Sequence, residues 1–138
     1  MAKYPGMDFT LLIDANARTG SVPSAGIGPA AVQTENRNGP LLRAYLDRFA
    51  LAAINTFYKG ATATWRSTRG YWCCIDYIVA PLHLAPRVEW CRTMDDIALT
   101  FSTEIDHVAV GARMAFSSIW SWCPSKAIFR LQQGSDAM

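Results

Sequence analysis

The sequence predicts an α+β fold, built mostly from antiparallel strands with one or two helices. Three features predict it: an apolar run near the N-terminus that ends in polar residues, one amphipathic helical pattern, and a second half made of short aromatic and β-branched segments. The chain has 138 residues and is 51% hydrophobic, which suits one modest core and is too short for two ordinary domains. We expect one domain over residues 1–116 and a tail or junction over residues 117–138.

The first half predicts a strand, a loop and a helix, in that order. The run "MDFTLLID" (7–14) is nearly continuously apolar, as expected of a strand covered on both faces. Residues 18–40 are rich in Gly, Pro, Ser and Asn and predict a long loop, which suggests that they border a site. The run "GPLLRAYLDRFAL" (39–51) then predicts a helix, with Gly39 as a cap and Pro40 in the first turn. Its expected apolar stripe consists of Leu41, Leu42, Tyr45, Leu46 and Phe49.

The second half predicts a sheet. Five segments are short and rich in aromatic and β-branched residues: 52–57, 62–67, 73–80, 88–94 and 107–116. They are separated by short stretches rich in Gly, Pro and charged residues. We therefore expect a helix followed by a group of neighbouring strands.

Charge and composition exclude several classes of protein. The formal charge of +2 provides no strong electrostatic footprint for nucleic acid or anionic membranes, so polyanion binding would need a local site. No apolar run reaches the length of a membrane span, and the N-terminus is unlike a secretory signal. We expect a soluble intracellular protein, nuclear or cytoplasmic, with no membrane partner.

The cysteines and one of the two histidines predict no metal site. The chain has no Cys-x-x-Cys spacing, and neighbouring residues on a strand face opposite sides, so buried free thiols are expected at Cys73, Cys74, Cys91 and Cys123. His83 lies in "APLHLAP", between two prolines, which predicts a solvent-facing loop.

Polar residues that interrupt or end apolar segments are the candidate site. Asp14 and Asn16 follow the first strand and would point the same way if the extended geometry continued, although Asp-x-Asn is also an ordinary turn sequence. Asp76 interrupts "CCIDYIVA", and Asp106 and His107 precede the last strand. A buried aspartate beside a histidine fixes the imidazole tautomer and leaves the other ring nitrogen free for proton transfer.

A structural interpretation stands beside the catalytic one for each of these residues. Asp76 is also suited to capping a local turn or pairing with Arg66 or Arg69, and His107 to a satisfied position in the core. For either residue alone, the structural interpretation is the stronger.

The order of these signals resembles the endonuclease/exonuclease/phosphatase superfamily, whose members are related to exonuclease III and DNase I. A strand ending in Asp-x-Asn is followed by a helix, "NTF" (55–57), "TW" (64–65), "IDYI" (75–78) and "DH" (106–107). The run from residue 38 to 80 is similar to the endonuclease domains of retrotransposons without long terminal repeats, which act beside a reverse transcriptase. The resemblance covers residues 9 to about 114.

The resemblance implies roles for the matching residues. Asp14 positions or deprotonates the attacking water, Asn16 contacts the scissile phosphate, and Asp76 orients the catalytic His107. Asp106 lies near a divalent cation, Mg²⁺ or Mn²⁺. Asn38 and Asn55 are candidates for substrate contact or turn formation, and Trp65 is a candidate for substrate binding with mainly a packing role.

The same resemblance implies a fold in two halves, of which this chain matches the C-terminal one. The superfamily packs two similar sheets in a DNase I-like sandwich, and its main metal ligand is a glutamate of the first half. Glu35, Glu89 and Glu104 lie in the wrong segments to replace it, and Ile13, Ala15 and Ile105 depart from the motif residues at their positions. We expect a truncated domain that leaves one sheet face exposed, self-associates, and is weakly active or inactive unless an N-terminal half or a second chain completes it.

Three functions therefore remain open from the sequence. The first is an Mg²⁺-dependent hydrolase of nucleic acid, DNA rather than RNA. The second is a non-catalytic nucleic-acid-binding or scaffold remnant, in which Trp120, Trp122 or the arginines matter and Asp14 and His107 do not. The third is a phosphoesterase acting on a small or lipid phosphate.

Overall fold

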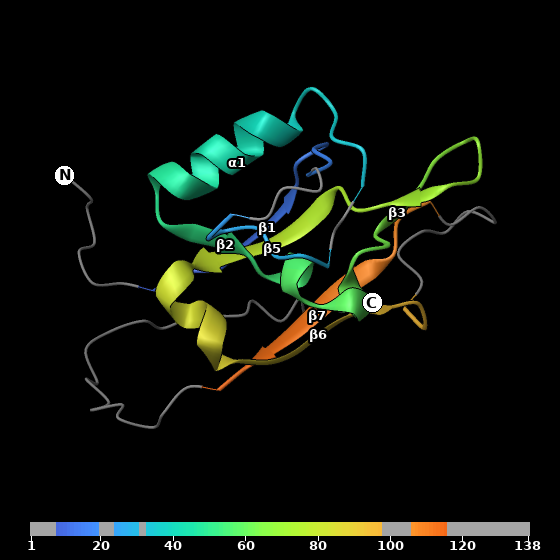
Figure 1. Ribbon diagram of the computed structural model, residues 1–138. Helices are drawn as coiled ribbons and strands as arrows, with labels where there is room; N and C mark the ends of the chain where they lie inside the picture. Colours follow the sequence, from blue (N-terminus) through green and yellow to red (C-terminus); the bar gives the residue numbers. More distant parts are fainter. Residues whose placement is uncertain (1–7, 20–23, 31–32, 98–105, 116–138) are drawn as a thin grey trace, which may run out of the picture.

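The computed structural model describes residues 8–19, 24–30, 33–97 and 106–115, and confirms the α+β class (Figure 1). The single α-helix among these residues is α1 (Gly39–Arg48). The strands are β1 (Leu11–Asp14), β2 (Leu51–Ala53), β3 (Trp65–Arg66), β4 (Trp72–Cys73), β5 (Asp76–Pro81), β6 (Val88–Met94) and β7 (Ala109–Met114). Three short 3-10 helices connect them: η1 (Ile54–Phe57), η2 (Lys59–Ala61) and η3 (Leu82–Arg87).

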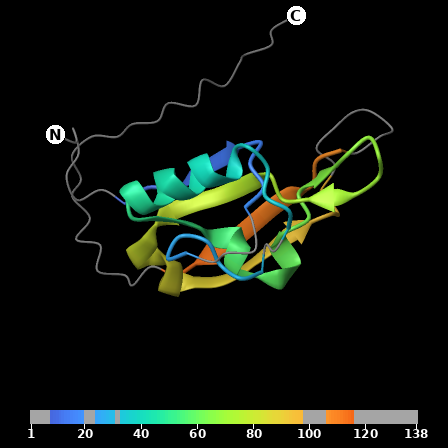
Figure 2. The ribbon, with the colours of Figure 1, turned by 45° about the horizontal axis from the view of Figure 1, so that its top comes forward.

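A three-stranded antiparallel sheet lies at the centre, in the order β1-β5-β2. Helix α1 covers one face, where Leu42 and Leu46 pack with Tyr77 and Val79 of β5. The β6–β7 hairpin packs on the other face. Figure 2 shows these three layers, helix, sheet and hairpin. Strand β5 is therefore buried on both faces, which explains its continuous run of apolar residues after Asp76.

Helix α1 begins where the sequence predicts, with Pro40 in its first turn. The predicted cap at Gly39 is wrong, because Asn38 occupies the N-cap position and Gly39 is the first helical residue. Gly39 is required there because a Cβ atom would collide with the carbonyl oxygen of Arg18. The predicted apolar stripe is only partly correct: Leu42 and Leu46 are buried. The rest of the stripe is exposed, and it comprises Leu41, Tyr45 and Phe49.

Three predicted strands are wrong in their extent. Segment 52–57 is extended only to Ala53 and then turns into η1. Segment 73–80 divides into the end of β4 and all of β5 except Pro81, with Cys74 and Ile75 between the two strands. Segment 62–67 is a strand only over β3, whereas 88–94 is confirmed as β6 and 107–116 contains β7.

Strand β1 is an edge strand, and its two faces differ. Leu11 and Ile13 pack against the core on the α1 side, but Leu12 is 76% exposed on the opposite side. The prediction that β1 is covered on both faces is therefore wrong. The expectation of an open sheet face holds only along β1, because the β6–β7 hairpin covers Ile78 and Ala80 of the neighbouring strand.

The predictions for the cysteines and for His83 are confirmed where the structure describes these residues. Cys73, Cys74 and Cys91 are buried and free, and burial raises the pKa of the Cys74 thiol to about 12. His83 is solvent-exposed, as predicted, and contacts Asp8 at 2.9 Å. No helix within the described ranges is long and apolar enough to cross a membrane. Cys123 and the predicted tail lie outside the described residues.

Candidate active site

Two carboxylates face each other at one end of the central sheet. Asp14 ends β1, Asp76 begins β5, and the two residues are directly opposed in the antiparallel register. Directly opposed residues place their side chains on the same face of a sheet, so the two carboxylates share one small volume. Asp14 is exposed, whereas the Asp76 side chain retains 21% of its accessible surface. Asp76 is the first residue of its strand, and the sequence prediction that placed it in mid-strand is corrected accordingly.

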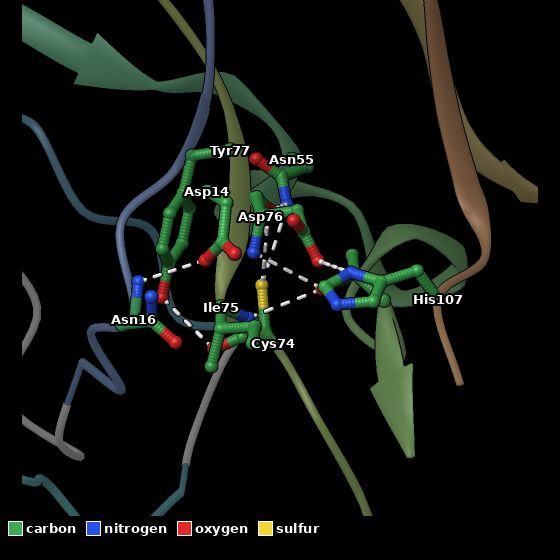
Figure 3. Close-up of polar contacts among 9 residues, drawn as sticks. Asp14, Asn16, Asn55, Cys74, Ile75, Asp76, Tyr77 and His107 are labelled. Atoms are coloured by element: carbon green, nitrogen blue, oxygen red, sulfur yellow. Dashed lines mark hydrogen bonds and ion pairs between the residues drawn. The ribbon is translucent and has the colours of Figure 1, made fainter.

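His107 reaches this pair from a third segment of the chain. An isolated bridge joins His107 to Trp65 of β3, with hydrogen bonds from Val108 N to the Thr64 carbonyl (2.8 Å) and from Arg66 N to the Asp106 carbonyl (2.7 Å). His107 Nδ1 lies 3.2 Å from Asp76 Oδ2. Figure 3 shows Asp76 between Asp14 and His107. The predicted pairing of the aspartate with the histidine is thus present.

The environment of Asp76 favours its protonated form. Burial is the main cause that raises the pKa of Asp76, and the nearby Asp14 carboxylate adds to the effect. Hydrogen bonds from Thr64 and His107, and the charge of His107, act in the opposite direction. A carboxyl group with a raised pKa keeps its proton to a higher pH than a free aspartate does.

Thr64 is a site residue that the sequence analysis missed. Its side chain is fully buried, and its hydroxyl oxygen accepts hydrogen bonds from the backbone N–H groups of Ile75 and Asp76, both at 3.1 Å. These bonds hold the chain as it turns from β4 into β5 and thereby fix the start of β5. The only sequence signal was a threonine within the predicted "TW" segment, which carries no chemistry by itself.

The backbone turns sharply directly after Asp14. Asn16 has a φ of 46°, a left-handed conformation that asparagine tolerates better than most residues. Its N–H donates a hydrogen bond of 3.0 Å to Asp14 Oδ1. The extended geometry therefore ends before Asn16, and the ordinary turn interpretation of Asp-x-Asn is correct for the backbone. The same turn fixes one oxygen of the Asp14 carboxylate.

The three predicted substrate-binding residues have structural contacts. Asn55 is fully buried, and its amide contacts the backbone of Ala61, Asp76 and Ile78 at 3.1–3.2 Å. Asn38 donates to the carbonyl oxygen of Asn16 at 3.0 Å. Trp65 is half-buried and pairs with Cys73 in the β3–β4 ladder. These contacts favour turn formation and packing over substrate contact, above all for Asn55.

The described residues do not fit a complete Mg²⁺ site. Such a site needs several carboxylate or carbonyl oxygens around one point, and within the described ranges no three His, Cys, Asp or Glu side chains are grouped so as to hold a metal ion. Asp106 is exposed, and the contact that anchors it runs through its backbone carbonyl. Its predicted role near a cation stays a prediction.

Among the described residues, Asp76 pairs with His107 and with neither of the two arginines that the sequence offered as alternatives. Arg66 and Arg69 are exposed, and the ion pair of Asp76 is with His107.

A separate cleft of about 430 Å³ is lined by Ile54, Phe57, Tyr58, Ala85 and Pro86, none of which belongs to the aspartate–histidine cluster.

The arrangement can hold a histidine in one tautomer and orient a second carboxylate toward the same space. If the Nδ1–H donates to Asp76, then Nε2 is the ring nitrogen available for proton transfer, and the half-exposed imidazole is accessible to solvent.

Comparison of the chain with models of protein families, with curated proteins and with solved structures finds no match.

Proposed function

We propose that this chain carries the acid–base residues of a phosphodiesterase that hydrolyses nucleic acid. The observation that carries the proposal is the convergence of Asp14, Asp76 and His107 from three separate segments, with His107 Nδ1 at 3.2 Å from Asp76 Oδ2. A single buried aspartate is commonly structural. An aspartate that is paired with an accessible histidine and directly opposed to a second carboxylate is typical of proton-transfer chemistry.

Each residue of the cluster has a distinct task in the proposed reaction. Asp76 holds the imidazole of His107, so that the histidine can stabilise charge that develops on the phosphate oxygens. Asp14 accepts a proton from, or orients, the attacking water. Asn16 lies on the turn beside Asp14, and in the proposed reaction it contacts the phosphate.

The described residues supply only part of a metal-dependent site. Mg²⁺ or Mn²⁺ is the expected cofactor of the resembling superfamily, yet its ligand set is incomplete in this part of the chain. The proposal therefore includes ligands from another segment or another chain. It predicts that hydrolysis by this chain alone is weak.

An exposed hairpin beside the cluster supports nucleic acid as the substrate over a small phosphoester. The β3–β4 hairpin adjoins His107 through Trp65. Its residues Tyr71 and Trp72 are 49% and 46% exposed, and it also carries exposed arginines, Arg66 and Arg69. Aromatic side chains stack on unpaired bases, which a small phosphoester does not offer, and arginines bind the phosphates of the backbone.

Nicking of supercoiled plasmid tests the proposal. The purified chain is incubated with plasmid and Mg²⁺, with and without EDTA, beside two variants, His107→Ala and His83→Ala. His83 is the matched control because it is the other histidine of the chain and is exposed away from the cluster. We expect nicking that requires the metal, is retained by His83→Ala, and falls about 100-fold in His107→Ala, the loss typical of a removed proton-transfer group.

Three results would contradict this function. Equal nicking by the wild type and His107→Ala would mean that a contaminant or another group is responsible. Plasmid binding without nicking in any variant would favour the non-catalytic nucleic-acid-binding alternative. Hydrolysis of a small phosphate ester without plasmid nicking would support the phosphoesterase alternative.

A further inference from the structure

Two asparagines upstream of α1 contact the turn that follows Asp14. The Asn36 amide donates to the Asn16 carbonyl oxygen at 2.9 Å, and the Asn38 amide donates to the same oxygen at 3.0 Å. We call Asn36 and Asn38 the asparagine clamp. One carbonyl oxygen thus receives two side-chain donors, which uses both of its lone pairs.

Asn36 also ties this turn to the helix. Its side-chain oxygen accepts hydrogen bonds from the N–H of Arg18 (2.8 Å) and the N–H of Gly39 (3.1 Å). Three bonds from one half-buried side chain therefore connect the Asp14 turn, at Asn16 and Arg18, with the first residue of α1. Helix α1 is itself fixed on the sheet by Leu42 and Leu46, so it provides a rigid anchor.

The clamp acts on the residue whose backbone orients the candidate catalytic carboxylate. Asn16 is in the left-handed region, which costs energy for a residue with a Cβ atom and persists only when surrounding contacts impose it. In this conformation the Asn16 N–H points at Asp14 Oδ1. Holding the Asn16 carbonyl from one side therefore holds its N–H against Asp14 on the other.

We infer that Asn36 is a positioning residue for Asp14, acting through the Asn16 peptide, with Asn38 as its assistant. The inference rests on the proposed function for its catalytic meaning, because Asp14 matters to chemistry only if the site is hydrolytic. Among the described residues, the side chain of Asn36 bonds Asn16, Arg18 and Gly39, so its link to Asp14 runs through this turn. Asn36 helps to orient the Asp14 carboxylate, whereas the Asp76 carboxylate contacts His107.

The substitution Asn36→Asp isolates the positioning contact. An aspartate keeps an oxygen for the N–H groups of Arg18 and Gly39 but cannot donate to the Asn16 carbonyl, and places a negative oxygen against it. Asn38→Ala removes the second donor alone, since the Asn38 side chain makes no capping bond to the helix. The two variants together separate the clamp from the anchoring of α1.

Amide hydrogen exchange of the full chain, followed by NMR, reads the effect without any need for activity. We expect the Asn16 amide, which bonds Asp14 Oδ1, to exchange about tenfold faster in Asn36→Asp and by a smaller factor in Asn38→Ala. The amides of Gly39 and Ile78 are internal references, because their acceptors are retained. We expect their exchange to stay within about twofold of the wild type.

Two outcomes would overturn the inference. Unchanged exchange at Asn16 in both variants would show that the clamp does not hold the turn. Equal acceleration at Asn16, Gly39 and Ile78 would show that Asn36 supports the whole fold and has no specific effect on Asp14.

The nicking assay tests whether Asn36 also affects the rate of hydrolysis. If the wild type nicks plasmid, Asn36→Asp should lower kcat by about tenfold with KM little changed, because a misdirected water affects the chemical step more than binding. If the wild type does not nick, the proposed function fails, while the exchange result still decides whether Asn36 positions Asp14.

Discussion

Replacing Asn55 with alanine decides whether this asparagine is a structural or a substrate-binding residue. Its amide continues the β2–β5 ladder where β2 ends. Beyond Ala53 the chain turns into η1, and the Asn55 side chain takes over as the acceptor for Ile78 N–H and as a donor to the carbonyls of Asp76 and Ala61. A buried asparagine thus replaces one rung of backbone pairing.

The expected loss follows from the groups left without a partner. Ile78 and Ala61 are 4% and 0% exposed, so water does not readily replace the amide. Each buried polar group left unpaired costs about 1–3 kcal/mol, and two such groups give a decrease in the free energy of unfolding of about 4 kcal/mol. That is a large part of the stability of a typical domain of this size, about 5–15 kcal/mol.

Urea unfolding followed by tryptophan fluorescence measures this loss. With a denaturant slope of about 2 kcal/mol per molar, the unfolding midpoint of Asn55→Ala should fall by about 2 M. Asn38→Ala is the control, because the hydrogen bond from its side chain to the Asn16 carbonyl oxygen is exposed and its loss should cost about 1 kcal/mol or less. An Asn55→Ala protein that unfolds like the wild type but no longer binds or nicks plasmid would refute the structural role and restore the substrate role.

Three further predictions concern charge, surface and core. Asp76→Asn should flatten the pH dependence of the free energy of unfolding. Burial raises the folded-state pKa of Asp76 above its ordinary value of 3.8. The protonated carboxyl group therefore stabilises the fold at low pH, and this stabilisation is lost as the pH rises through the raised value. Urea midpoints from about pH 3 to pH 7 should therefore fall more for the wild type than for the variant, and parallel curves would contradict this. Leu12→Lys should reduce self-association, as measured by analytical ultracentrifugation, because Leu12 is an apolar side chain that is 76% exposed. The free energy of unfolding should change by less than about 0.5 kcal/mol. Unchanged self-association would mean that the contact surface lies elsewhere. Leu46→Ala should cost about 2–5 kcal/mol by urea unfolding and Leu41→Ala almost nothing, since only the first is buried; equal losses would mean that both sides of α1 are covered.

Local patterns predicted the parts of the fold that depend on neighbouring residues. The helix start is visible in "NGP", because proline suits the first turn, and β6 is visible as a short segment bounded by Pro86 and a charged pair. The pairing of Asp76 with His107 was implied by the resemblance to the endonuclease/exonuclease/phosphatase superfamily, since the residues alone left Arg66 or Arg69 open as partners of this carboxylate.

Other features depend on contacts between distant residues and carried no local signal. The "AAINTF" run is apolar enough for a strand, but the Asn55 side chain replaces its backbone pairing, and η1 forms instead. Gln33 exchanges two hydrogen bonds with the backbone of Cys74, in the break between β4 and β5, from far away in the sequence. Asn36 shows the same limit: its residue type predicts a turn, and only the fold reveals which carbonyl it holds.

The edge position of β1 links the candidate site to the order of folding. Asp14 meets Asp76 only when β1 pairs with β5, a contact between Leu11–Asp14 and a strand that begins 62 residues after Asp14. Such long-range pairing closes a large loop and forms slowly compared with a helix or hairpin. We therefore expect β1 to dock late and to detach first in partial unfolding. Whenever this short strand opens, the two carboxylates separate while the Asp76–His107 pair stays in place, so the site would lose its Asp14 before the rest of the protein unfolds.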